Sequence, residues 1–562
     1  MDKKQKREKR LDRIGLACGL LLIALAIFSS IVANATPVAG VKDSEIPDHA
    51  ITLTGTADGR NGPISVEVIT DKDSIYRITV TNHTETEGIG DQAVKQLPAQ
   101  IFQAQNVSAV DAVSGATISS EGIRSAIAAA FLSNEAKAAD INPKHFGANP
   151  VKAELLALRP DVDALKGEDG HIKVLTSADW AETYPNEYLS WKQNEENDGL
   201  DENGELEDYL KEYPMLSTLY DNYGFSWDYK GARGHMFDIE DVTHTERVGG
   251  KTMASCFTCK TPMLTAMVLE EGDSAYGKSF AEVKDMMVEP ISCFNCHANS
   301  PMDELGKVNL TVTHGYLIDG VGEDFESIDA ANLSCGQCHN EYFFNPNKDG
   351  KPTTLPHSDL ESMHPDAILA FYNNPDNFVS GEPFYDFVTD SGVKEIKVQH
   401  PELETFLSEG SQHRNTYSCA DCHMGKVKDA EGKTYSSHYL ISPLDNPELI
   451  EGECSKCHAD LVAEVRATQA EVERRTYAVG YELMFLHQRL IEAEESGEYK
   501  DKELEEIRAI ARDAQFYWDF VFVENSEGAH NPTLAYECLD KAEELCNQAL
   551  SLFHPIIVEK KA

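Results

Sequence analysis

Ten of the thirteen cysteines form five C-x-x-C pairs, and four of these pairs are followed directly by histidine. The five pairs are Cys256–Cys259, Cys293–Cys296, Cys335–Cys338, Cys419–Cys422 and Cys454–Cys457. C-x-x-C-H is the attachment motif of c-type haem, in which both thiols form thioethers and the histidine binds the iron. Four copies in one chain do not fit zinc sites or disulfides, so they predict covalently attached haem.

The pair Cys256–Cys259 differs because Lys260 follows it. A lysine amine can bind iron only when it is deprotonated, which requires burial or the metal itself to lower its pKa. The residues alone leave three interpretations open: a haem with a lysine ligand, a damaged haem site, or an isolated pair with a redox role or none. Of the three remaining cysteines, Cys538 and Cys546 lie in a helical pattern and are interpreted as buried thiols.

The N-terminus follows the pattern of an exported protein. Residues 1–13 are rich in lysine and arginine, and Ile14 to Ala35 carries no formal charge. Two alternatives stay open: a cleaved signal peptide with an A-x-A site ending at Ala35, or an uncleaved membrane anchor, for which about 20 apolar residues suffice. In either case we expect the rest of the chain outside the cytoplasm.

Composition excludes several classes of protein. The chain has 562 residues with 49 Lys and Arg against 95 Asp and Glu, a formal net charge of −46. Such a balance argues against a nucleic-acid partner, which needs clustered basic residues, and against general adhesion to anionic lipid. A hydrophobic share of 41% argues against disorder. The length predicts several domains.

A first module is predicted at residues 47–135. Short, alternating β-branched runs between 51 and 83 predict antiparallel strands, 96–105 reads as a connector, and 121–132 predicts a helix capped by Ser119 or Ser120. The small residues at 111–120 suit either a phosphate at the helix N-terminus or an ordinary Ser/Gly turn.

This module resembles the FMN-binding domain of flavin subunits in ion-pumping quinone and ferredoxin oxidoreductases. The resemblance rests on two motifs, His83-x-Glu85-x-x-Gly88-x-Gly90 and Asp111-x-x-Ser114-Gly115-Ala116-Thr117. It implies a small α+β domain with covalent FMN, whose phosphate is esterified to Thr117 by a flavin transferase.

The remainder, 140–562, resembles the ammonia-forming cytochrome c nitrite reductases, whose catalytic haem sits in a C-x-x-C-K motif. The shared motifs are Arg233-Gly234-His235, Arg247 nine residues before Cys256, Cys335 to Tyr342, Lys397-Val398-Gln399-His400-Pro401, and His438. The resemblance implies a mainly α multihaem domain with long C-terminal helices. Within this module, the acidic, Asn- and Gly-rich stretch at 192–208 predicts an exposed loop.

The resemblance also implies a role for each matching residue. Lys260 is the ligand of the catalytic haem, with Arg247, Tyr342 and His400 around its open side. Four further haems have two histidines each, which pair as His297 with His438, His339 with His235, His423 with His530, and His458 with His413. A calcium site is formed by Glu341, Gln399 and the backbone carbonyls of Tyr342 and Lys397.

Physical chemistry agrees with one catalytic haem that receives electrons from four others. Reduction of nitrite to ammonium takes six electrons and eight protons, and one haem cannot hold that many electrons. Nitrite is an anion, so an acidic protein needs a local cationic pocket, for which the fixed charge and forked donors of Arg247 are suited. His400 can relay protons, and calcium adds positive charge beside the site.

The leading hypothesis is an extracytoplasmic flavin–pentahaem nitrite reductase, with five haem c, calcium and FMN. It requires haem c maturation machinery and an electron donor, a membrane quinol or dehydrogenase, and the helices of 460–522 could form a homodimer seam. One alternative keeps the scaffold but reduces hydroxylamine, sulfite or an organic nitro compound. Another is a non-catalytic electron-transfer flavocytochrome. Flavin dehydrogenase chemistry is disfavoured because no G-x-G-x-x-G fingerprint is found at a strand–helix junction.

The flavin attachment is directly testable. Replacing Thr117 by Ala removes the hydroxyl that would carry the phosphate, so we expect loss of protein-bound flavin fluorescence on a denaturing gel. Fluorescence that persists in T117A would contradict the assignment.

Overall fold

The computed structural model describes residues 38–554 apart from 72–73, 87–89, 108–109, 111–112, 114–115, 132, 134–135, 137–140, 142–165, 169, 202, 251, 298–315, 323, 325–327 and 348–351. The chain divides into two compact units, Met1–Ala157 and Leu158–Ala562, each described by itself. The predicted signal peptide or anchor at 1–35 lies outside the described residues, and none of the helices among those residues has the length and apolarity to cross a membrane. The predicted domain limits stay a prediction.

The first unit contains an antiparallel four-stranded sheet in the order β1-β4-β3-β2. Its strands are β1 (Val38–Gly40), β2 (Ile51–Asp58), β3 (Pro63–Thr70) and β4 (Ile75–Asn82). Along β3 the buried residues alternate, with Ile64, Val66 and Val68 turned toward the core. This alternation is the pattern of a sheet with one covered face.

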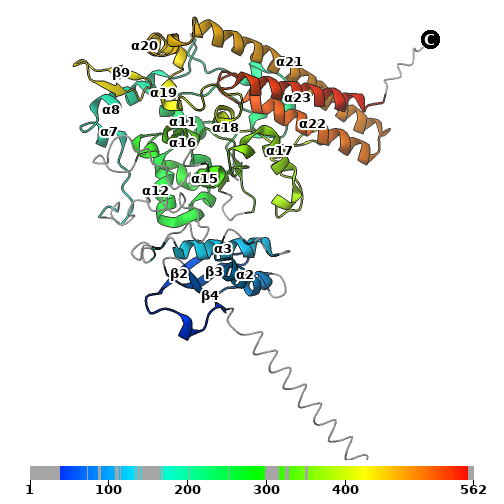
Figure 1. The fold of residues 1–562 in the computed structure, drawn as a ribbon. Coiled ribbons are helices and arrows are strands. Elements are labelled where there is room, and N and C mark those ends of the chain that lie inside the picture. Colours follow the sequence, from blue (N-terminus) through cyan, green and yellow to red (C-terminus); the bar gives the residue numbers. More distant parts are fainter. Residues whose placement is uncertain are drawn as a thin grey trace, which may run out of the picture. The chain divides into compact units, whose positions relative to one another are not determined.

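Helices α2 (Gly90–Ala104) and α3 (Thr117–Phe131) pack on this sheet (Figure 1). A Cβ at Gly55 would overlap the carbonyl oxygen of Ala126, so glycine is needed where β2 approaches α3. The small α+β fold agrees with the sequence, but two details were wrong. Residues 96–105 belong mostly to α2 and are not a connector, and α3 begins at Thr117, which places Ser119 and Ser120 inside the helix.

In the described part of the second unit the fold is mainly helical, with three short hairpins. Its shorter α-helices are α7 (Ser177–Trp180), α8 (Pro185–Lys192), α9 (Tyr209–Glu212), α10 (Leu216–Leu219), α11 (Asp238–Thr243), α12 (Pro262–Glu271), α13 (Phe280–Val283), α14 (Cys293–Cys296), α15 (Tyr316–Val321), α16 (Ala330–Gly336), α17 (Pro365–Asn373), α18 (Glu402–Leu407), α19 (Cys419–His423) and α20 (Pro447–Gly452). The hairpins pair β5 (Phe343–Phe344) with β6 (Thr353–Thr354), β7 (Phe387–Val388) with β8 (Lys394–Glu395), and β9 (Lys426–Lys428) with β10 (Thr434–Ser436).

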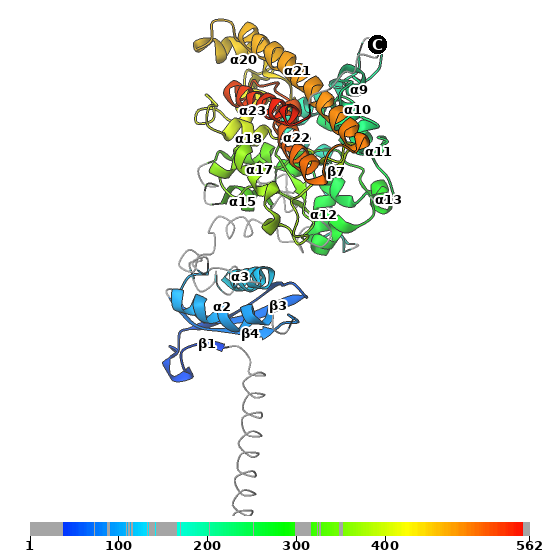
Figure 2. The same ribbon diagram turned by 90° about the vertical axis from the view of Figure 1, so that its right-hand side faces the viewer.

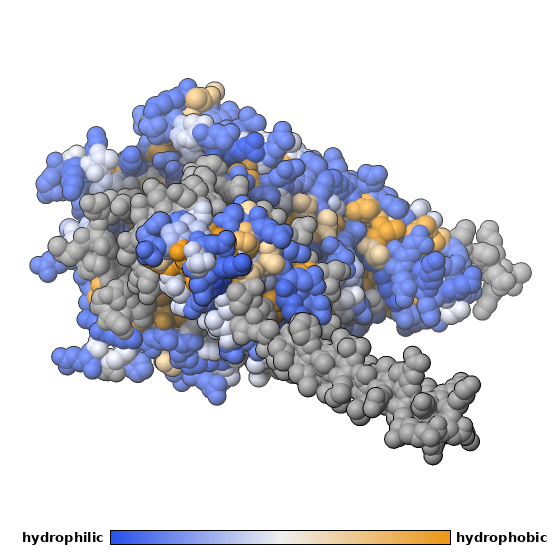
Figure 3. Space-filling model, turned by 60° about the horizontal axis from the view of Figure 1, so that its bottom comes forward, coloured by the Kyte–Doolittle hydropathy of each residue, from blue (hydrophilic) through white to orange (hydrophobic). Residues whose placement is uncertain are grey.

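Three long helices close the chain: α21 (Leu461–Ser496), α22 (Asp501–Phe522) and α23 (Pro532–Ser551). They lie side by side (Figures 1 and 2). Asp460 caps α21, and Gly497 ends it with a left-handed conformation (φ 65°). Cys538 and Cys546 are buried on α23, as expected. Hydrophilic residues dominate the described surface on the face in Figure 3, which fits the strong negative charge.

Lys397 and Asp519 form a buried ion pair between the segment after β8 and helix α22. The Lys397 Nζ lies 3.3 Å from both carboxylate oxygens of Asp519, and both residues are almost inaccessible to solvent. Asp519 also accepts hydrogen bonds from the Val398 amide at 2.9 Å and from the Tyr220 hydroxyl. This carboxylate therefore ties residues 397–398 to the long helices.

Replacing Asp519 by Asn leaves the Lys397 charge buried without its partner. We expect the free energy of unfolding to fall by about 3–5 kcal/mol, measured by urea denaturation followed by circular dichroism. A matched control is Glu382→Gln, which removes the exposed Lys394–Glu382 pair and should cost about 0–1 kcal/mol. Equal losses in the two variants would contradict the stabilising role of the buried pair.

Candidate active site and metal centres

Each predicted attachment motif occupies about one helical turn. The amides of His297, His339 and His458 donate to the carbonyls of the first cysteine of their motifs, at 2.8, 3.0 and 2.9 Å. At Cys256–Cys259 the Lys260 amide donates instead to the Phe257 carbonyl, at 3.1 Å. A single turn places two residues three apart on one side and the next residue beneath them. The arrangement suits two thioether bonds and one axial ligand.

Cysteines of different motifs also lie close together. The pKa of Cys335 is raised by hydrogen bonding to Cys419 and by burial, and that of Cys338 is raised by hydrogen bonding to Cys259 and by burial. The pKa of Cys422 is raised by burial and then by the charge of Cys454, which belongs to another motif. Together these contacts connect the motifs of Cys454, Cys419, Cys335 and Cys259 into a continuous series.

The structure brings together all four histidine pairs that the sequence predicts. Their ring centroids are separated by 6.2 Å for His235–His339, 6.3 Å for His297–His438, 6.1 Å for His413–His458 and 6.2 Å for His423–His530. A metal–imidazole bond is about 2.0 Å, so two rings on opposite sides of one metal atom have centroids about 6 Å apart. His400 also lies 6.4 Å from His339, so spacing alone is not unique there.

Hydrogen bonds at Nδ1 orient several of these rings. His423 and His438 contact the carbonyl oxygens of Ile441 and Ser436 through Nδ1, at 3.0 and 3.1 Å. Carboxylates serve the same purpose for His458, which contacts Glu464, and for His530, which contacts Glu524, both at 2.7 Å. An imidazole held through Nδ1 presents Nε2 to a metal, and such outer contacts are usual for metal-binding histidines.

Burial favours the neutral, metal-binding form of some rings. It lowers the pKa of His235 to about 3 and that of His423 to about 4. The Nδ1 of His235 is buried without a hydrogen-bond partner among the described residues. At His339 burial acts in the same direction, but the Glu402 carboxylate outweighs it and raises the pKa to about 9.

Lys260 points toward an acidic partner that the sequence did not reveal. Its Nζ lies 3.3 Å from Oδ1 of Asp238, the first residue of α11. Because of this carboxylate the pKa of Lys260 is raised, although burial opposes the shift. Of the two causes that the sequence left open for a deprotonated Lys260, burial is therefore not sufficient in the protein alone, and the metal would have to remove the proton.

Arg247, Tyr342 and His400 come from separate segments of the chain. Each interacts electrostatically with the motif Cys256–Lys260. The Arg247 guanidinium lies over the Phe225 ring at 4.4 Å and donates to Thr245 at 3.1 Å. Its charge opposes the burial that raises the pKa of Cys256 to about 11. Tyr342 is half-buried, and its pKa is raised well above the usual value by desolvation and then by the charges of Cys259 and Cys256.

His400 combines accessibility with a depressed pKa. Its side chain is accessible to solvent, yet the surrounding protein desolvates it and lowers its pKa to about 4, with smaller effects from neighbours that include Lys260 and Cys259. The ring is therefore neutral near pH 7 and offers one donor and one acceptor. Each of the three predicted side chains thus interacts electrostatically with Cys256, Cys259 or Lys260.

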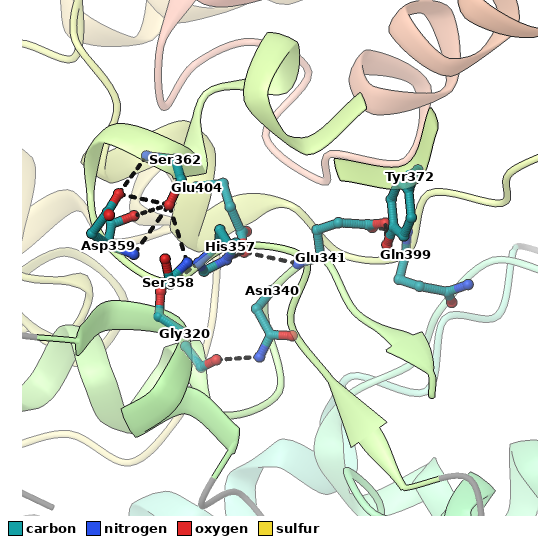
Figure 4. A network of polar contacts seen from close by, with 11 residues as sticks. Gly320, Asn340, Glu341, His357, Ser358, Asp359, Ser362, Tyr372, Gln399 and Glu404 are labelled. Carbon is teal, nitrogen blue, oxygen red and sulfur yellow. Dashed lines mark hydrogen bonds and ion pairs between the residues drawn. The ribbon is translucent and has the colours of Figure 1, made fainter. Parts of the chain in front are cut away.

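Two of the residues predicted to bind calcium, Glu341 and Gln399, are in direct contact (Figure 4). The Glu341 carboxylate accepts from the Gln399 amide at 2.7 Å and from the Tyr372 hydroxyl at 2.8 Å. The Gln399 side chain donates to the Lys397 carbonyl at 2.9 Å. A half-turn of this carboxamide would place its oxygen beside the Lys397 carbonyl, and carboxylate, carboxamide and carbonyl oxygens are the ligands that calcium prefers.

A second layer of buried groups supports Glu341 (Figure 4). The Glu341 amide donates to Glu404 at 3.0 Å, and the Glu404 carboxylate pairs with His357 at 2.8 Å. On the other side of the site, Asp386 accepts from the Lys397 amide at 2.9 Å. The sequence did not predict these partners, nor Asp238 and Asp519, because no local pattern distinguishes an acidic residue that contacts the site from any other.

The predicted flavin site is described only in part. The side chain of Thr117 and residues Gly88, Ser114 and Gly115 lie outside the described residues. Within the described part, the buried Glu85 of the first motif accepts a hydrogen bond from Ser119 of α3. The first motif is therefore in contact with helix α3, which begins at Thr117 of the second motif.

Comparisons with known proteins agree with both units. A family model described as cytochrome c552 matches residues 176–560, and one described as an FMN-binding domain matches residues 59–131. The cytochrome c nitrite reductase subunit NrfA of Nitratidesulfovibrio vulgaris is 30% identical over 411 residues, which are 66% of this chain and 76% of that protein.

A solved structure shows the same likeness. The cytochrome c nitrite reductase from Desulfovibrio desulfuricans superposes with a TM-score of 0.59 at 28% identity, over 67% of this chain and 85% of that one. The family model spans well over half of the residues. The chain therefore belongs to the cytochrome c552 family, in which it resembles the cytochrome c nitrite reductases, and it carries an FMN-binding domain ahead of the cytochrome.

Proposed function

We propose that this protein reduces nitrite to ammonium at a haem c attached to Cys256 and Cys259 with Lys260 as its ligand. The observation that carries the proposal is the electrostatic interaction of Arg247, Tyr342 and His400 with the one attachment motif that lacks a histidine. Nitrite plus six electrons and eight protons gives ammonium and two waters. The similar cytochrome c nitrite reductases support the same substrate.

Four further haems would supply the electrons. The spacing of the four histidine pairs fits axial ligands on opposite sides of an iron. A haem with two imidazoles has no open position and transfers electrons, whereas a haem with one protein ligand can bind substrate. The series of neighbouring cysteine motifs supports electron transfer from one haem to the next.

Each residue of the site has a task that follows from its chemistry. Arg247 holds the anionic substrate through its forked donors, and Phe225 and Thr245 hold the guanidinium in place. Tyr342 keeps its hydroxyl proton because of its raised pKa, so it serves as a donor. The neutral His400 ring can accept a proton at one nitrogen and donate from the other.

Calcium would bind Glu341, Gln399 and the carbonyls of Lys397 and Tyr342. The cation would offset the buried Glu341 charge and fix the chain between Lys397 and His400. The solved relative from Desulfovibrio desulfuricans is described with two calcium sites in its catalytic subunit.

FMN esterified to Thr117 would donate electrons to the haems. The matched FMN-binding domain and the contact between Glu85 and Ser119 support the flavin site. We propose that the protein acts outside the cytoplasm, where haem c is attached, as a homodimer that receives electrons from a quinol or dehydrogenase.

Arg247→Gln removes the charge and fork that would hold nitrite. We expect kcat for nitrite to fall by about 100- to 1,000-fold. The intact mass should show that the variant carries the same number of haems as the wild type. The control is Arg474→Gln, which alters an exposed arginine of α21 paired with Glu471 and should leave the rate unchanged. An R247Q protein with full activity, or a wild type that turns over sulfite, hydroxylamine or an organic nitro compound better than nitrite, would contradict the proposal.

Calcium removal tests the second metal site. Chelation should lower nitrite reduction, and Ca²⁺ should restore it while Mg²⁺ does not, because Mg²⁺ demands near-octahedral geometry. Glu341→Gln removes the one carboxylate of the set and should abolish this response, whereas Glu382→Gln should respond like the wild type. If chelation changes neither the rate of nitrite reduction nor the midpoint of thermal unfolding, the calcium site is ruled out.

A further inference from the structure

Asp238 is a buried carboxylate directly beside the proposed iron ligand. Its Oδ1 lies 3.3 Å from the Lys260 Nζ, and its Oδ2 is buried without a hydrogen-bond partner among the described residues. The residue as a whole is 8% exposed. A buried acceptor of this kind lowers the stability of the fold unless it accepts a hydrogen bond.

The position of Asp238 is set on both sides. It begins α11 directly after the short 3-10 helix His235–Phe237, which carries another proposed haem ligand. Arg233 holds this corner, because its Nε donates to Asp241 of α11 at 2.8 Å and its guanidinium lies over the Phe237 ring at 4.4 Å. The carboxylate is therefore held at Lys260 by contacts that do not involve Lys260.

A neutral amine that binds a metal through its lone pair still carries two N–H groups. In a desolvated site these groups need acceptors, and Oδ1 of Asp238 is within reach of one of them. Outer hydrogen bonds to a ligand and nearby charge are two means by which proteins tune a metal. An anion so near the ligand stabilises the more positive, oxidised iron.

We propose that Asp238 is a positioning residue, which accepts a hydrogen bond from the Lys260 amine, orients it toward the iron and lowers the midpoint potential of that haem. The inference rests on the proposed function, because it requires Lys260 to be a haem ligand. Asp238 itself does not touch the substrate.

The test compares the holoproteins of three variants. Asp238→Asn removes the charge, Asp238→Glu keeps it, and Glu240→Gln is the matched control. Glu240 lies on the same helix, its side chain is 58% exposed, and its ion pair is with Arg233. Intact mass gives the haem count, and a redox titration monitored by the high-spin signal gives the potential of the lysine-ligated haem.

In D238N we expect an unchanged haem count and a positive shift of this one potential, with the other four haems unaffected. D238E should recover most of the wild-type value, and E240Q should match the wild type. If D238N fails to attach the haem, Asp238→Ser is measured in its place.

Two failures can be told apart. An unshifted potential in the loaded D238N or D238S protein would overturn the role of Asp238 alone. A wild-type protein in which every haem is low-spin would overturn both this role and the proposed function.

Discussion

The four histidine pairs of the second unit all have the separation that two imidazoles need in order to bind one metal, and the proposed function depends on this constraint. Four pairs have ring centroids 6.1 to 6.3 Å apart, and each joins a histidine of an attachment motif to one far away in the sequence. Metal–nitrogen bonds tolerate little change in length. The short helices and loops between the motifs, and the long helices behind them, must therefore hold each pair at that separation.

Buried carboxylates organise the site beside those pairs. Asp519 holds the Lys397–Val398 segment, Glu341 holds the amide of Gln399, and Glu404 holds the amide of Glu341. Each is buried, so each depends on its donors, and removal of a partner leaves a desolvated charge. The chain between Lys397 and His400 is consequently fixed from two directions, by α22 and by the segment that carries Tyr342.

Sequence patterns were reliable where the signal was local and failed where it was not. The strands of 51–83 and the long helices on either side of Gly497 follow from alternation, helical periodicity and a terminating glycine. Residues 96–105 were interpreted as a connector, although Val94, Leu97 and Ile101 keep helical spacing on the buried face of α2. The start of α3 was placed too late because two serines suggested a cap.

The sequence by itself determined the five attachment motifs, the exceptional lysine and the two families, because a C-x-x-C pair and its following ligand act within one helical turn. The family resemblance also implied which histidines pair. Only the tertiary structure decided which carboxylate contacts Lys260 and which one pairs with the buried Lys397. Those contacts join residues from 22 to more than 100 positions apart. They depend on packing over the whole unit, and no local preference of the chain encodes that packing.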